Sequence, residues 1–196
     1  MSDLIASEAW DIQQARHLYS IHRWGAGYFD INDGGRVIAR PLRDAGASVD
    51  LTDVIEEAKA RGLKFPLLVR FQDILRNRVE SINTAFRNAI SEFNYQGGYR
   101  GVFPIKVNQL REVVEEILDA GRPYDFGLEV GSKPELFAGL ALQSQMGSLI
   151  VCNGYKDAAF VRMALLGIKL GKKVIMVVEK LEELRQIITV SKQLGV

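Results

Sequence analysis

Disulfide bonds, membrane spans and an excess of one charge are all missing from this sequence. Its single cysteine, Cys152, leaves no partner for an internal disulfide, which is typical of a reducing cytoplasm. The longest apolar runs are too short to cross a bilayer. The net charge is +1, from 25 basic and 24 acidic residues, and no basic face stands out. We therefore expect a soluble cytoplasmic protein with neither nucleic acid nor membrane as partner.

A secretory signal is also missing from the start of the chain. Asp3 and Glu8 flank a very short apolar run there, whereas a signal needs a basic start and a longer apolar core. Metal-ligand spacing is missing around His17 and His22, so we expect no zinc site. Cys152 is expected to be a small core residue.

Residues 1–64 predict a small amino-terminal segment of mixed structure. A short helix is expected over residues 9–19, with Ser7 available as its cap. The extended runs YFDIN and RVIARP surround Asp-Gly-Gly at residues 33–35, which predicts a hairpin. Apolar residues then recur at helical spacing from Leu51 to Ala58, and Trp10 and Trp24 are expected in the core of this segment.

Residues 65–196 show a regular alternation of apolar strands and amphipathic helices. Apolar runs begin near residues 66, 100, 125, 149 and 174. An amphipathic helical pattern follows each of these runs, most clearly over residues 110–121, and others extend over residues 134–145, 157–170 and 181–194. Near-continuous apolar strands that alternate with helices predict an α/β fold with a parallel sheet covered by helices.

Two observations favour a (β/α)8 barrel over an open doubly wound sheet. Neither a G-x-G-x-x-G motif nor a phosphate loop of the G-x-x-x-x-G-K-S/T type occurs. Each expected strand ends in a polar residue, and carboxyl strand ends converge on the active-site face of a barrel. These residues are Arg70, Lys106, Glu129, Asn153 and Glu179. A barrel needs eight strand–helix units, so we expect residues 65–196 to be the first five units of a truncated barrel; an open five-stranded sheet is the alternative.

Lys106 is the main candidate for chemistry. It ends the run Gly-Val-Phe-Pro-Ile, and a lysine at the end of a buried strand loses hydration, which favours the neutral amine. A neutral amine attacks aldehydes to form a Schiff base. The alternative is a lysine that extends from the barrel rim into water.

Several segments carry a resemblance to a known family. GVFPIKVNQLREVVEEI resembles the cofactor-lysine segment of the pyridoxal-phosphate-dependent decarboxylases with the alanine-racemase-like fold. The runs HRWGAGYFDIN, FPLLVRFQDIL, GLEVGSKPEL and VCNGYKDAAF agree in the same order. The first and last of these resemble the biosynthetic arginine decarboxylase branch in particular.

The resemblance implies that Lys106 binds pyridoxal 5′-phosphate as a Schiff base and that Glu129 is an acidic residue beside the cofactor. The alternative role for Glu129 is that of a carboxylate at the barrel rim that pairs with a nearby cation. Glu135 occupies another family carboxylate position but also suits a first helical turn, and Asn108 suits a helix cap.

The implied reaction converts L-arginine to agmatine and carbon dioxide, at the head of polyamine synthesis. The resemblance also implies magnesium, for which no ligand can be assigned, and a homo-oligomer. The acidic partner of the pyridine nitrogen, the glycine-rich phosphate loop and the carboxyl-terminal β domain of the family are not found in this sequence. Two alternatives stay open: another enzyme of this fold, such as a racemase or an ornithine, lysine or diaminopimelate decarboxylase, and a non-catalytic fragment.

Overall fold

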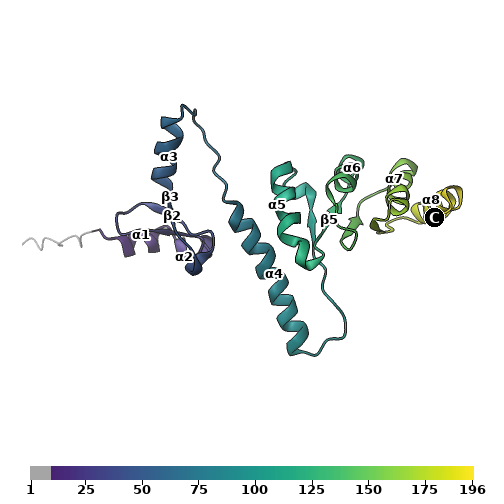
Figure 1. Ribbon diagram of the computed structural model, residues 1–196, viewed down its shortest axis with the longest axis horizontal. Coiled ribbons are helices and arrows are strands. Elements are labelled where there is room, and N and C mark those ends of the chain that lie inside the picture. The colour runs from purple at the N-terminus through teal and green to yellow at the C-terminus, as the bar shows by residue number, and fades with distance from the viewer. Residues whose placement is uncertain (1–9) are drawn as a thin grey trace, which may run out of the picture. The chain divides into compact units, whose positions relative to one another are not determined.

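The computed structural model describes residues 10–196 (Figure 1). Contacts divide the chain into two units, Met1–Asn77 and Arg78–Val196, later in the chain than the boundary expected between residues 64 and 65. The helix α4 (Gln72–Glu92) crosses this division. The expected cap at Ser7 lies outside the described residues.

The first unit contains a three-stranded antiparallel sheet in the order β1-β2-β3. Its strands and helices are α1 (Ile12–Leu18), α2 (Ile21–Trp24), β1 (Phe29–Ile31), β2 (Val37–Ala39), β3 (Val49–Asp50) and α3 (Leu51–Ala60). The expected hairpin is confirmed, with Asp30 paired to Ile38. Asp11 begins α1 through a capping box with Gln14, and the Asp50 side chain caps α3.

Two expectations for the first unit are wrong. Residues 65–71 form no strand, because a strand requires a ladder partner and none of the described residues pairs with this segment. Leu68 is 77% exposed there, as an unpaired apolar segment would be. Trp10 and Trp24 are also exposed and not in the core. The Trp24 ring contacts that of Phe29 in a tilted pair, at a centroid distance of 5.6 Å.

The second unit contains a four-stranded parallel sheet in the sequential order β4-β5-β6-β7. Its strands are β4 (Val102–Pro104), β5 (Gly127–Val130), β6 (Leu149–Cys152) and β7 (Lys173–Met176). Each strand is followed by a helix, in order α5 (Arg111–Gly121), α6 (Lys133–Leu142), α7 (Ala158–Lys169) and α8 (Leu181–Leu194). The sequential order is that of a barrel, because a doubly wound sheet reverses its order at a switch point. The expected partial barrel is confirmed for these four strand–helix units, one fewer than expected.

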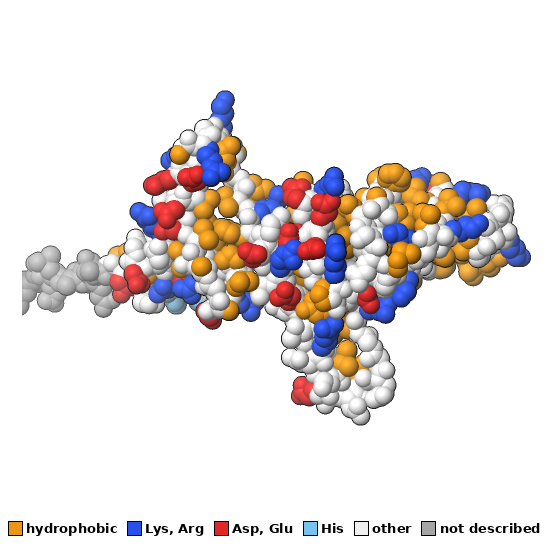
Figure 2. All heavy atoms as spheres, viewed as in Figure 1, with side chains coloured by type: hydrophobic (Ala, Val, Ile, Leu, Met, Phe, Trp, Pro, Cys, Tyr) orange, Lys and Arg blue, Asp and Glu red, His pale blue; other side chains and the backbone are white. Residues whose placement is uncertain are grey.

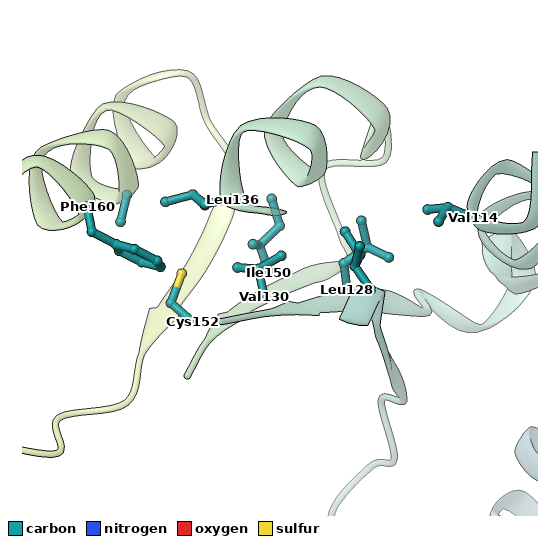
Figure 3. Packing of buried hydrophobic residues seen from close by; sticks show 9 residues of the cluster. Val114, Leu128, Val130, Leu136, Ile150, Cys152 and Phe160 are labelled. Carbon is teal, nitrogen blue, oxygen red and sulfur yellow. The ribbon is translucent and has the colours of Figure 1, made fainter. Parts of the chain in front are cut away.

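One face of this sheet is buried against the helices (Figure 3). Leu128 and Val130 on β5, and Ile150 and Cys152 on β6, alternate toward the helices and are fully buried. Burying side chains of this kind contributes about 1.5–3 kcal/mol each. Leu136 of α6, Phe160 of α7 and Val114 of α5 complete this core from the helix side. The alternation leaves Glu129 on the opposite face of the sheet.

The surface of the second unit carries both charges. Figure 2 shows acidic and basic side chains interspersed over α5, where Arg111 pairs with Glu115 at 2.7 Å and Arg122 with Asp119 at 3.2 Å. Among the described residues, no helix is both long and apolar enough to cross a membrane.

Candidate active site

Lys106 lies in a single 3-10 turn, Ile105–Val107, that directly follows β4. Ile105 is 3% exposed and packs into the core, whereas the Lys106 side chain is exposed. The expected dehydration of Lys106 is therefore not observed, because the turn carries its side chain past the covered end of the strand. Within the described part of the chain, the Lys106 amine makes no hydrogen bond or ion pair.

Glu129 lies on β5 and is only 6% exposed. Its strand register places it between Pro104 on β4 and Val151 on β6. The side-chain amide of Asn153 donates a hydrogen bond of 2.9 Å to Glu129 Oε1. The polar partner of Glu129 among the described residues is thus an amide and not a cation. Lys106 follows two residues after Pro104, so Lys106 and Glu129 belong to the same edge of the sheet.

Lys156, which the sequence patterns did not single out, is the most buried cation of this edge. Its side chain is fully buried, and Nζ donates to the carbonyls of Gly154 at 2.5 Å and Val177 at 2.6 Å. Nζ also lies 3.7 Å from Oε2 of Glu183, a residue that is 2% exposed in the first turn of α8. A buried ion pair thus joins the loop after β6 to the first turn of α8.

Glu183 is further held by backbone donors. The N–H of Lys156 donates to Oε1 at 2.8 Å, and the N–H of Glu179 donates to Oε2 at 2.9 Å. Burial by itself raises the pKa of Glu183, but these donors and the Lys156 ammonium outweigh it, so the pKa lies below its ordinary value. Glu183 is therefore an ionised structural carboxylate.

The other candidate residues from the sequence are Glu179, Arg70, Glu135 and Asn108. Glu179 accepts a hydrogen bond of 2.7 Å from the N–H of Gly154. Arg70 belongs to the first unit. Glu135 accepts from the N–H of Gly131 at 2.7 Å in front of α6, so its observed contact is a structural one. Asn108 is not the N-cap of α5, which is Leu110, but its side chain accepts from the N–H of Leu110 at 3.1 Å.

A cavity of about 740 Å³ lies beside this edge, where α6, α7 and α8 begin. Lys133 and Asp157 line it and pair at 2.6 Å, and the hydrogen bond from Lys133 lowers the pKa of Asp157. The Lys180 ammonium lies 3.7 Å from the centroid of the Tyr155 ring in the same cavity. Lys106 and Glu129 do not line this cavity, so it is separate from the part of the sheet edge that holds these two residues.

Neither a metal-binding cluster nor a reactive thiol is found among the residues that the structure describes. Within residues 10–196, no group of three or more His, Cys, Asp or Glu side chains could hold a metal ion. Cys152 is confirmed as a buried core residue, and burial raises the pKa of its thiol to about 12. A thiol with such a pKa is not a nucleophile at neutral pH.

Comparisons with known proteins give one family. The profile of the pyridoxal-dependent decarboxylases, pyridoxal binding domain, matches residues 79–196. The biosynthetic arginine decarboxylase of Alkalilimnicola ehrlichii is 53% identical over 188 residues, 95% of this chain and 30% of that protein. The one of Nostoc sp. is 48% identical over 190 residues, 97% of this chain and 28% of that protein.

A solved structure agrees with these relatives. The biosynthetic arginine decarboxylase SpeA of Campylobacter jejuni superposes with a TM-score of 0.82 at 33% identity, over 89% of this chain and 29% of that one. The chain thus spans less than a third of the length of each of these relatives. Since the profile match covers more than half of the chain, the chain belongs to the family of the pyridoxal-dependent decarboxylases and carries their pyridoxal-binding domain over residues 79–196.

Proposed function

We propose that this chain forms the cofactor-tethering part of an arginine decarboxylase, which converts L-arginine to agmatine and carbon dioxide in polyamine synthesis. The observation that carries the proposal is the position of Lys106, an exposed amine without an ion pair at the carboxyl edge of a parallel sheet in a pyridoxal-binding domain. The substrate follows from the relatives in Alkalilimnicola ehrlichii and Nostoc sp., both named biosynthetic arginine decarboxylases.

The residues at this edge fit pyridoxal 5′-phosphate. A primary amine that is open to solvent can reach the aldehyde carbon of the cofactor, and the buried Glu129 carboxylate lies on the adjacent strand. Bound pyridoxal phosphate supplies the electron sink that lets a carboxyl group leave the α-carbon of an amino acid. Lys106 would hold the cofactor, and Glu129 would lie beside it on the adjacent strand, as the family resemblance implies.

Three further features belong to the proposal. We expect the enzyme to act in the cytoplasm, as its single cysteine suggests, and as a homo-oligomer, as the family resemblance implies. The resemblance also implies magnesium, but the described residues include no group of three or more His, Cys, Asp or Glu side chains that could hold a metal ion, and no magnesium ligand is assigned. A small-molecule substrate follows from the arginine decarboxylases named above.

Cofactor labelling tests the role of Lys106 on the chain itself. The purified chain is incubated with pyridoxal 5′-phosphate, reduced with borohydride, digested and mapped by mass spectrometry. We expect label on Lys106 before any other lysine, and loss of that label in Lys106→Ala. Lys106→Arg should behave like Lys106→Ala, because a guanidinium stays protonated and is not an amine nucleophile. Lys169, exposed at the end of α7, provides the matched control as Lys169→Ala, which should label normally.

A chimera tests the substrate. The segment of the Alkalilimnicola ehrlichii enzyme that matches this chain is replaced by the chain, and carbon dioxide release is measured from arginine, ornithine, lysine and diaminopimelate. We expect arginine to be the preferred substrate and Lys106→Ala to abolish its turnover. Preference for another of these amino acids would refute the arginine assignment, and labelling that avoids Lys106 would refute the cofactor assignment.

A further inference from the structure

Asn153 joins Glu129 to the loop that follows β6. Asn153 directly follows β6, and its Nδ2 donates to Glu129 Oε1 on the neighbouring β5 at 2.9 Å. Glu129 is 6% exposed, so little water is available to replace this donor. A hydrogen bond to an ionised carboxylate is among the stronger ones in proteins and fixes the orientation of the acceptor.

The backbone around Asn153 is held on both sides. Its own N–H donates to the carbonyl of Val130 at 2.9 Å, which extends the pairing of β5 and β6 by one residue. The next N–H, of Gly154, donates to Glu179 at 2.7 Å, and the carbonyl of Gly154 accepts from the buried Lys156 ammonium. The Asn153 amide is therefore aimed at Glu129 by contacts that exist without any ligand.

We propose that Asn153 is a positioning residue, which holds the Glu129 carboxylate away from an ion pair with Lys106; this inference rests on the function proposed above. Lys106 stands two residues beyond Pro104, the strand partner of Glu129. Without the Asn153 amide, the Glu129 carboxylate would lose the donor that fixes it and would be free to turn toward Lys106. An ion pair favours the protonated amine, and a protonated amine does not attack an aldehyde.

The test measures the rate at which pyridoxal 5′-phosphate labels Lys106 in a double-mutant cycle on the full 196-residue chain. Asn153→Ala should slow labelling about tenfold, as expected for the loss of a hydrogen bond to a charged group. In a Glu129→Gln background, Asn153→Ala should have no further effect, because the residue acts through the Glu129 charge. Asn153→Asp keeps the shape of the side chain but loses the donor, and should also slow labelling.

Controls separate this role from a purely structural one. Gln193→Ala removes an exposed amide from α8 in the same unit and should leave the labelling rate unchanged. Equal slowing by Asn153→Ala in both backgrounds, or slowing by Asn153→Ala but not by Asn153→Asp, would overturn the positioning role. A wild-type chain that is not labelled at Lys106 would instead refute the proposed function, so the two failures are distinguishable.

Discussion

Glu183→Gln is expected to destabilise the second unit by about 3 kcal/mol, at the low end of the cost of removing one partner from a buried ion pair. The Lys156 ammonium would stay buried with only the Gly154 and Val177 carbonyls as partners. The glutamine would also place an NH2 group against one of two backbone donors, either the N–H of Lys156 or that of Glu179. One hydrogen bond is therefore lost in addition to the charge.

Urea unfolding followed by far-UV circular dichroism measures this loss. A domain is typically stable by about 5–15 kcal/mol, so a large shift of the midpoint is expected. Glu182→Gln is the matched control, because Glu182 lies next to Glu183 but is exposed, and it should cost only a few tenths of a kcal/mol through the helix dipole. Trp10 and Trp24 both belong to the first unit, and their fluorescence transition should not move.

The effect of Glu183→Gln should depend on pH. The folded-state pKa of Glu183 lies below the ordinary glutamate value of 4.5. The stabilisation from its ionised form is therefore complete above pH 4.5 and is lost as the pH falls through the folded-state pKa. The stabilities of wild type and Glu183→Gln should converge in that acidic window. A difference that does not change with pH, or equal effects of Glu182→Gln and Glu183→Gln, would refute the buried-pair reasoning.

Three other outcomes are expected. Gly127→Ala should prevent stable folding, because its Cβ would lie 2.0 Å from the carbonyl oxygen of Leu149. Gly98→Ala should be tolerated, because there is open space around Gly98, and soluble yield and circular dichroism compare the two variants. Cys152 should resist iodoacetamide at pH 8 in the folded chain, with a pKa of about 12, and mass spectrometry should find it alkylated only after unfolding. The chain alone should release no more carbon dioxide from radiolabelled arginine than free pyridoxal phosphate does. Decarboxylation needs a preorganised site, and the four strands of this sheet leave Ile175 exposed on the face that the helices do not cover.

The parallel sheet was predictable because its strands and helices carry local signals. The apolar runs of β5 and β6 and the 3.6-residue pattern of α5 and α8 depend on residues that are close in sequence. The strand expected near residue 66 carried the same apolar signal and is wrong. Pairing is the missing information: an apolar segment becomes a strand only where a neighbour completes its ladder, and sequence composition does not report the neighbour.

The residues of the candidate site were predictable only in part. The expectation that Lys106 and Glu129 belong to adjacent strands agrees with the register of β4 and β5, but neither residue ends its strand. Lys106 lies in the turn after β4, and β5 continues past Glu129 to Val130. Asn153 was noted as a strand-end residue, but its amide contact with Glu129 depends on a side-chain torsion that no pattern encodes. The available signal was the position of Asn153, a polar residue directly after β6. In the sheet, β6 lies next to β5, which carries the Glu129 carboxylate.

The two lysines of this edge show why burial is hard to predict from local sequence. Lys106 follows a buried isoleucine and is exposed, whereas Lys156 follows Gly-Tyr in a polar loop and is fully buried. What buries Lys156 is Glu183, 27 residues later, together with carbonyls from two loops. An ammonium is stable inside a protein only where such partners converge, and their convergence is a property of the fold. The exposed Lys106 has no such partners among the described residues, and for that reason we propose Lys106, and not Lys156, as the amine that binds the cofactor.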